Sequence, residues 1–134
     1  MKLTSSAVAL VLLVVAGCGG SDSSFTKDYN DAVRPLSRLG EGLGTKPGAF
    51  DRLAQGTAQT RSNLEQLDPP DGTQDEFDRL LVRLDEVTQD LKAVAGAERS
   101  KDVVRQRRAA RALVRSSDAV EQAETTFKRA VEDG

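Results

Sequence analysis

The sequence predicts an all-α fold, an up-down-up-down four-helix bundle, on three observations. Apolar residues recur at intervals of three and four in four stretches between residues 25 and 132, which places them on one face of each predicted helix. Segments rich in glycine and proline separate the first three stretches. Each stretch also carries an aromatic residue on its apolar face, and antiparallel packing of consecutive helices is the simplest way to bury four such faces together.

The first predicted helix begins near Phe25 and ends in a glycine-rich segment. Ser23 or Ser24 can cap its start, because a serine oxygen accepts a hydrogen bond from a free backbone N–H of the first turn. Pro35 lies within the pattern, where it removes a backbone donor and strains the preceding turn at a cost of about 3 kcal/mol. We therefore expect a kink at Pro35 or two shorter helices. The apolar face consists of Phe25, Tyr29, Val33, Leu36, Leu39 and Leu43.

The second predicted helix runs from about Ala49 to Leu67. Gly56 lies inside it and weakens it by about 1 kcal/mol relative to alanine. The segment 68–72, with two prolines and a glycine, ends it. Its apolar face consists of Phe50, Leu53, Thr57, Thr60, Leu64 and Leu67.

The third predicted helix has the clearest apolar stripe in the chain. Thr73 and Glu76 precede it with the spacing of a capping box, in which each side chain accepts a hydrogen bond from the other residue's backbone N–H. Gly96 is a natural stop for this helix. The stripe consists of Phe77, Leu80, Leu81, Leu84, Val87, Leu91 and Val94.

The fourth predicted helix is capped by Ser100 and runs to about Glu132. It is longer than the others, so we expect one of its ends to extend beyond the bundle. Glu124 falls on its apolar face, and we interpret this residue as marking that overhang and not as a buried acid. The expected core face consists of Val103, Ala110, Leu113, Val120, Phe127 and Val131, interrupted by Gln106, Ser117 and Glu124.

The first seventeen residues have the layout of a secretory signal peptide. Lys2 supplies a positive charge, residues 7–17 form an unbroken run of apolar and small residues, and Cys18 follows. The run is too short to cross a bilayer as a helix, which needs about 20 residues. We therefore expect residues 1–17 to be removed as a signal peptide.

The motif Val15-Ala16-Gly17-Cys18 resembles the lipobox of bacterial lipoproteins, in which an aliphatic residue and two small residues precede the cysteine. The resemblance implies that Cys18 receives a diacylglyceryl group, becomes the first mature residue and is often acylated at its new amino terminus. It also implies anchoring to the cell membrane on the extracytoplasmic face. The mature chain resembles small helical lipoproteins of high-GC bacteria, although the type of envelope stays open.

Residues 18–24 then form the lipidated cysteine and a small, polar tether, and residues 25–134 form the bundle domain. Six extended tether residues reach about 20 Å, so the domain stays near the lipid surface. Cys18 is the only cysteine, which excludes a disulfide framework. Loss of Lys2 leaves 18 basic against 21 acidic residues, a net charge of −3. Such a balance does not favour nucleic acid as a partner.

The sequence offers little that could support catalysis. It contains no histidine, so the usual metal ligand and the usual proton carrier near neutral pH are both missing. No nucleophile is paired with a base, and most carboxylates fall on predicted polar faces beside arginines. We expect no enzymatic activity, no metal, and no cofactor other than the covalent diacylglycerol on Cys18. The carboxylates considered are Asp75, Asp78, Asp85, Glu86, Glu121 and Glu124.

One basic segment suggests a binding surface. Between Arg99 and Arg115 there are seven basic residues and one acid, Asp102. At 100° per residue, four arginines lie within about 60° of the direction opposite Leu113. This arginine stripe is a candidate surface for an anionic partner, and the plain alternative is a solvated helix face. It consists of Arg107, Arg108, Arg111 and Arg115.

In an up-down-up-down bundle, the fourth helix starts at the end remote from the tether, so the arginine stripe points away from the anchoring membrane. We therefore expect the chain to be a non-enzymatic binding or structural module of the envelope, in contact with an anionic wall polymer or an acidic partner protein. One alternative is an extracytoplasmic sensor or ligand-binding domain, for which Tyr29 and an unpaired arginine would line a pocket. An enzyme would require a hidden pair of carboxylates in such a pocket.

Overall fold

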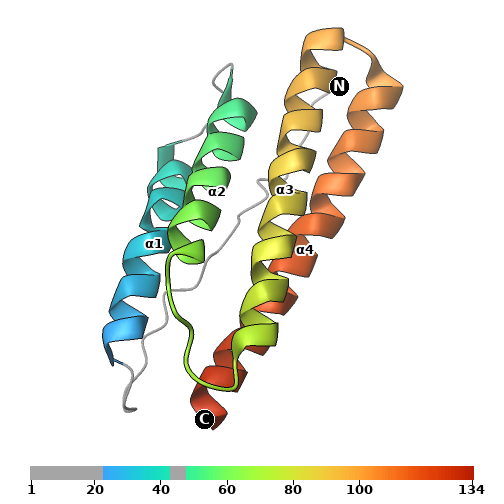
Figure 1. Cartoon of the computed structure of the whole chain (residues 1–134). Helices are drawn as coiled ribbons and strands as arrows, with labels where there is room; N and C mark the ends of the chain where they lie inside the picture. The colour runs from blue at the N-terminus through green and yellow to red at the C-terminus, as the bar shows by residue number, and fades with distance from the viewer. Residues whose placement is uncertain (1–22, 43–47) are drawn as a thin grey trace.

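The structure, a computed structural model, describes residues 23–42 and 48–134, with side chains at 24–36 and 48–134. These residues contain no strand and form four helices, α1 (Ser23–Gly42), α2 (Ala49–Glu65), α3 (Gln74–Ser100) and α4 (Val103–Asp133). Successive helices run in opposite directions (Figure 1). The all-α bundle predicted from the sequence is therefore confirmed.

Several predictions about the amino-terminal part lie outside the described residues. They are the signal peptide 1–17, the lipobox, the lipidated Cys18 and most of the tether. The side chains of Leu39 and Leu43, expected on the apolar face of the first helix, also lie outside them. The bundle itself begins at Ser23, two residues before the predicted boundary.

Aromatic side chains make the contact between the first and last helices of the bundle. Each helix lies beside the next one along the chain, and aromatic rings bridge α1 and α4. The ring centroids of Phe25 and Tyr29 lie 6.0 and 5.9 Å from that of Phe127. Phe77 of α3 joins the same cluster, 5.3 Å from Phe127. These offset and edge contacts place the start of α1 against the second half of α4.

Pro35 does not divide the first helix. α1 continues from Ser23 to Gly42 with Pro35 inside it, so the expected pair of shorter helices is not observed. Buried residues on both sides of the proline, including Val33 and Leu36, anchor the two halves to the same core. Tertiary packing therefore compensates for the missing hydrogen bond.

Small residues line the core face of α2. Ala54, Gly56, Thr57 and Thr60 are all buried, which allows the helix to pack closely against its neighbours. Gly56 is accommodated without a break. The helix ends at Glu65, slightly before the predicted end, although Leu67 still packs against the core.

The predicted capping box at the start of α3 is wrong. Thr73 occupies the N-cap position, but its side chain makes no capping hydrogen bond. Its hydroxyl instead donates to the carbonyl of Pro70 at 2.6 Å, and its backbone N–H donates to the same oxygen at 3.1 Å. Gly72, with φ of +82°, turns the chain so that Pro70 reaches back to Thr73. The hydroxyl is therefore directed toward the turn and accepts no hydrogen bond from the first turn of α3.

The boundary between α3 and α4 also differs from prediction. Gly96 does not stop α3, which continues to Ser100 and ends where Lys101 adopts a left-handed conformation with φ of +56°. Ser100 does not cap α4: its hydroxyl donates to the carbonyl of Ala97 and accepts from the backbone N–H of Asp102, which precedes the helix. Asp102 caps α4 by accepting from the backbone N–H groups of Val104 and Arg105, at 3.0 and 3.2 Å.

The predicted core face of α4 is correct from Leu113 onward but not in the first two turns of the helix. Leu113, Val120 and Phe127 are buried, whereas Val103 is 56% exposed and Ala110 is also exposed. Positions seven residues apart on a straight helix differ in direction by about 20° around the helix axis. Positions that repeat at this interval therefore face the core near the carboxyl end of α4 but point away from it near the amino end. Ala109 takes the inward place there. The overhang expected for this helix lies at the α3–α4 turn, above the start of α2 (Figure 1).

Candidate functional site

The arginine stripe is a continuous exposed surface on the first half of α4. All four guanidinium groups project from the exposed face, as the helical periodicity predicted. In the part of the chain that the structure describes, none of the four makes an ion pair or a hydrogen bond. Other arginines do have carboxylate partners: Arg61, Arg83 and Arg99 pair with acids at nitrogen–oxygen distances of 2.7, 2.9 and 2.8 Å. The stripe thus concentrates positive charge that the described residues do not neutralise.

The bundle topology places this stripe far from the beginning of α1. Phe25 packs against Phe127, and Arg108 precedes Phe127 by nineteen residues. A rise of 1.5 Å per residue separates the two positions by about 28 Å along α4. An arrangement with Arg108 and Arg111 beside Phe25 would have contradicted the prediction, and it is not observed.

The start of α4, just before the stripe, is electrostatically unfavourable. The first turn of α4 contains no acidic residue and carries Arg105. Positive charge there opposes the helix dipole by about 0.3–1 kcal/mol. Asp102 offsets part of this cost as the N-cap. The four arginines of the stripe lie beyond the first turn, so the helix dipole has little effect on them.

Glu124 is a buried acid, contrary to the interpretation that it marks an overhang. Glu124 is only 3% exposed, and it lies where α4 contacts α1. The hydroxyl of Tyr29 donates to Oε1 of Glu124 at 3.3 Å, and Nζ of Lys128 lies 3.1 Å from the same oxygen. A usable signal was present in the sequence, since both Tyr29 and Glu124 fall on apolar faces. The pairing between them depends on the register of α1 against α4, which periodicity alone does not provide.

Burial controls the ionisation of this cluster. Desolvation raises the pKa of Glu124, while the nearby charge of Lys128 and the hydrogen bonds from Lys128 and Tyr29 oppose the increase. Glu121, one turn earlier, adds a smaller upward effect. The pKa of the Tyr29 phenol is also raised, mainly by burial and then by the negative charge of Glu124. The cluster joins α1 to α4 and lines neither of the hollows described below.

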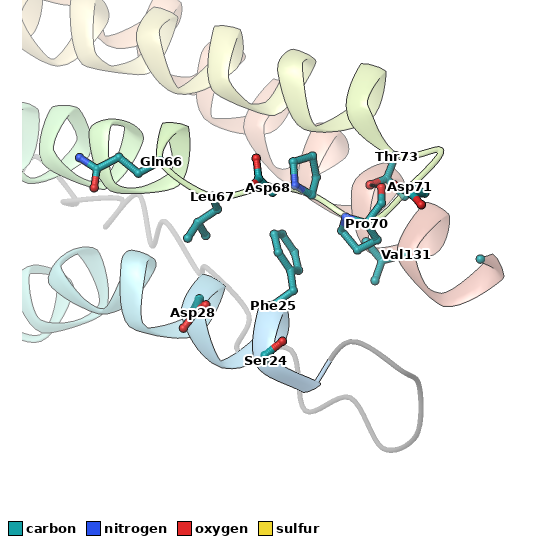
Figure 2. A pocket seen from close by; sticks show the side chains of 12 residues that line it. Ser24, Phe25, Asp28, Gln66, Leu67, Asp68, Pro70, Asp71, Thr73 and Val131 are labelled. Carbon is teal, nitrogen blue, oxygen red and sulfur yellow. Dashed lines mark hydrogen bonds between the residues drawn. The ribbon is translucent and has the colours of Figure 1, made fainter.

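The residues that the structure describes line at least two hollows that are open to the surface. The larger, of about 670 Å³, lies between the start of α1, the α2–α3 loop and the end of α4, and Figure 2 shows Phe25 pointing into it. Its acidic lining residues are Asp28, Asp68 and Asp71. The smaller, of about 320 Å³, lies between α3 and α4 and is lined in part by Arg115. Tyr29 lines neither of them, so neither is the pocket that the ligand-binding alternative anticipated.

The described residues contain no group of three or more acidic, cysteine or histidine side chains that could hold a metal ion. None of the helices described is both long enough and apolar enough to cross a membrane. Comparison of the chain with protein-family models, with curated proteins and with solved structures finds no match. The functional argument therefore rests on the chemistry of the chain itself.

Proposed function

We propose that this protein is a lipoprotein of the bacterial cell envelope, anchored at the extracytoplasmic face of the membrane through a diacylglyceryl group on Cys18. Its helical domain is a non-enzymatic binding or structural module. The arginine stripe contacts an anionic wall polymer or an acidic partner protein. The lipobox-like motif at residues 15–18 supports the anchor, and the arrangement of α1 and α4 supports the direction of binding.

One observation carries the binding proposal. Four exposed arginines without described acidic partners lie at the end of the bundle remote from the start of α1. An anchor at Cys18, joined by a tether of about 20 Å, leaves that end accessible from the side opposite the lipid. A surface that interacted with the protein's own bilayer would instead lie near Phe25.

The anchor is tested by comparing the full chain with a Cys18→Ala variant. Mass spectrometry of the purified native chain should show a mature protein that begins at Cys18 and carries the added mass of a diacylglyceryl group. The variant should lose that mass and leave the membrane fraction. An unmodified cysteine in a membrane-free native protein would refute the anchor.

Binding is tested with the soluble domain from Ser21 onward, which retains the complete described core. The domain is mixed with isolated envelopes, and the sedimenting fraction is measured at low and moderate salt. The test variant changes all four arginines of the stripe to alanine. The matched control removes the same charge from exposed positions elsewhere, namely Lys27, Arg34, Arg79 and Arg129.

Salt-sensitive sedimentation that survives in the control and is lost in the test variant is the expected result, because screening weakens contacts between exposed charges. Pretreatment of the envelopes with a protease distinguishes a protein partner from a polymer. Equal sedimentation of the test and control variants would show that the stripe is a solvated helix face.

The larger hollow favours a second candidate, a small-ligand-binding or sensor domain. Its volume of about 670 Å³ is in the range of small-molecule sites, about 300–1,000 Å³. Its walls combine Phe25, Leu67 and Val131 with carboxylates, a lining suited to an organic cation with an apolar body. A thermal-shift screen of such amines tests this candidate. A Phe25→Ala control should lose any shift that arises in the hollow.

A further inference from the structure

An exposed apolar strip runs beside the arginine stripe on α4. Val103 and Val114 are 56% and 48% exposed, and Ala110 between them is exposed as well. At 100° per residue these three positions lie within about 40° of one another. They form a narrow apolar line about 16 Å long, given the helical rise of 1.5 Å per residue. A partner that covered this line would remove its apolar surface from water.

Charges on both sides of Val114 follow a symmetric order. Arg107 and Arg111 precede it by seven and three residues, while Asp118 and Glu121 follow it by four and seven. All four charged residues are exposed and lie within about 60° of Val114 around the helix. None of them makes an ion pair among the residues that the structure describes. If a second, antiparallel α4 is placed opposite the first with the two Val114 residues facing each other, the basic positions of each helix therefore lie opposite the acidic positions of the other.

This order leaves four charges unpaired within one helix and pairs them between two. Arg111 and Asp118, the nearest opposite charges of the set, are seven residues or about 10 Å apart along α4. An antiparallel second helix brings its acidic half beside the basic half of the first and aligns the two dipoles in opposite directions. A patch that is complementary to itself under a twofold rotation is also what an isologous dimer requires.

We propose that a second copy of this chain docks on this face, with the two α4 helices antiparallel and the twofold axis near Val114. Arg107 of each copy then faces Glu121 of the other, and Arg111 faces Asp118. The proposal assigns a protein partner to Arg107 and Arg111, two of the four arginines of the stripe, so it rests on the protein-partner form of the binding role proposed above. A polyanion fits this face less well, because it would leave the valines exposed and meet repulsion from Asp118 and Glu121.

The first test uses the domain from Ser21 onward in sedimentation equilibrium between about 10 µM and about 1 mM, the range suited to a small interface. The native domain should associate to a dimer, more weakly at high salt. Arg107→Glu and Glu121→Arg should each raise the dissociation constant at least about tenfold, because each places two like-charged contacts in the dimer. Asp75→Arg and Arg79→Glu are the controls. Both positions lie near the start of α3, outside the proposed interface, so these variants should associate as the native domain does.

Mixing the two single variants provides the decisive measurement. A pair of one Arg107→Glu chain and one Glu121→Arg chain has two restored attractive contacts, so the mixture should dimerise although each variant alone does not. A folding defect could not produce this recovery. A monomeric native domain at every concentration, or a mixture that stays monomeric, would overturn the proposal.

Cross-linking tests the position of the axis. The chain from Ser21 onward contains no cysteine, so Val114→Cys introduces a single thiol at the proposed twofold axis. Val82→Cys is the matched control, since Val82 is 54% exposed on α3. Mild oxidation should link the Val114→Cys variant through a disulfide much faster than the control, and equal rates would contradict the antiparallel arrangement.

These tests are independent of binding to envelopes. Glu121→Arg disrupts the dimer but leaves all four arginines of the stripe in place. If envelope binding is correct and self-association is not, this variant binds envelopes as the native domain does, and the native domain is monomeric. If self-association is correct and envelope binding is not, the variants behave as described in solution while no form sediments with envelopes.

Discussion

Replacement of Glu124 by glutamine should make the bundle more stable at neutral pH, and the gain should disappear in acid. Glutamine has nearly the same volume and keeps an acceptor for the Tyr29 hydroxyl, but it carries no charge to bury. Replacement of a whole buried ion pair by neutral groups of similar size is neutral to stabilising by about 1–4 kcal/mol, but Glu124→Gln removes one partner only and leaves the charge of Lys128 in place. The side chain of Lys128 is 18% exposed, so water reaches that charge, and we expect a gain of at most about 1 kcal/mol.

The sign of the pH dependence follows from the direction of the pKa shift. Burial raises the pKa of Glu124 in the folded state, whereas in the unfolded chain the carboxyl titrates near its usual value of about 4.3. The protonated carboxyl of Glu124 therefore stabilises the native protein most at pH values below this usual pKa. As the pH rises through the pKa of the folded state, the native protein loses this stabilisation, by about 1.4 kcal/mol for each unit by which the pKa is raised.

Urea unfolding followed by circular dichroism, at several values between about pH 4 and about pH 8, measures the difference between native and Glu124→Gln proteins. The comparison cancels the titration of the exposed carboxylates, which both proteins share. The difference should be small near pH 4 and should grow in favour of glutamine toward neutral pH. A stability difference that stays constant with pH, or that grows as the pH falls, would refute the reasoning.

Three further substitutions test the packing and capping described above. Phe127→Ala removes the ring shared by the aromatic cluster and should cost about 3–5 kcal/mol in the free energy of unfolding, whereas Val82→Ala on the surface should change it by less than about 0.5 kcal/mol. A loss below 1.5 kcal/mol for Phe127→Ala would contradict the cluster's role, with about 4 °C of melting temperature expected per kcal/mol. Tyr29→Phe keeps the ring but removes a donor to a buried carboxylate, which should cost about 1–2 kcal/mol in the same unfolding assay. Asp102→Ala removes the cap of α4 and should cost about 0.5–2 kcal/mol, and a larger loss from Ser100→Ala would show that the cap had been assigned to the wrong residue.

The periodicity of apolar residues was sufficient to predict the four helices because each helix buries one face. It was most accurate for α3, where Phe77, Leu80, Leu84 and Leu91 are buried as expected. This helix lies between two neighbours over most of its length, so its inward direction varies little. Exposure of the arginine stripe followed from the same rule, since its members lie opposite Leu113.

The errors have two causes: a local turn or helix continuation that the pattern did not reveal, at Gly96 and Thr73, and a partner distant in the chain, at Glu124. Gly96 looked like a helix stop, yet the helix continues past it, and a side chain there would meet only Arg105 at 3.9 Å. Thr73 had the spacing of a capping box, but the turn at Pro70 uses its hydroxyl. Glu124 looked like a sign of exposure because its partner, Tyr29, lies 95 residues earlier in the chain. Such partners are defined by helix register, which only the assembled bundle establishes.

The first and last described residues of the chain lie at the same end of the bundle, and this affects how the protein can be labelled. Gly134 and Ser24 line one hollow, so a fluorescent protein fused to the carboxyl terminus would share the narrow space between the domain and the lipid if Cys18 is acylated. The exposed turn at Lys101 lies at the opposite end of the bundle. A short epitope inserted in that turn would leave both the lipid anchor and the aromatic cluster undisturbed.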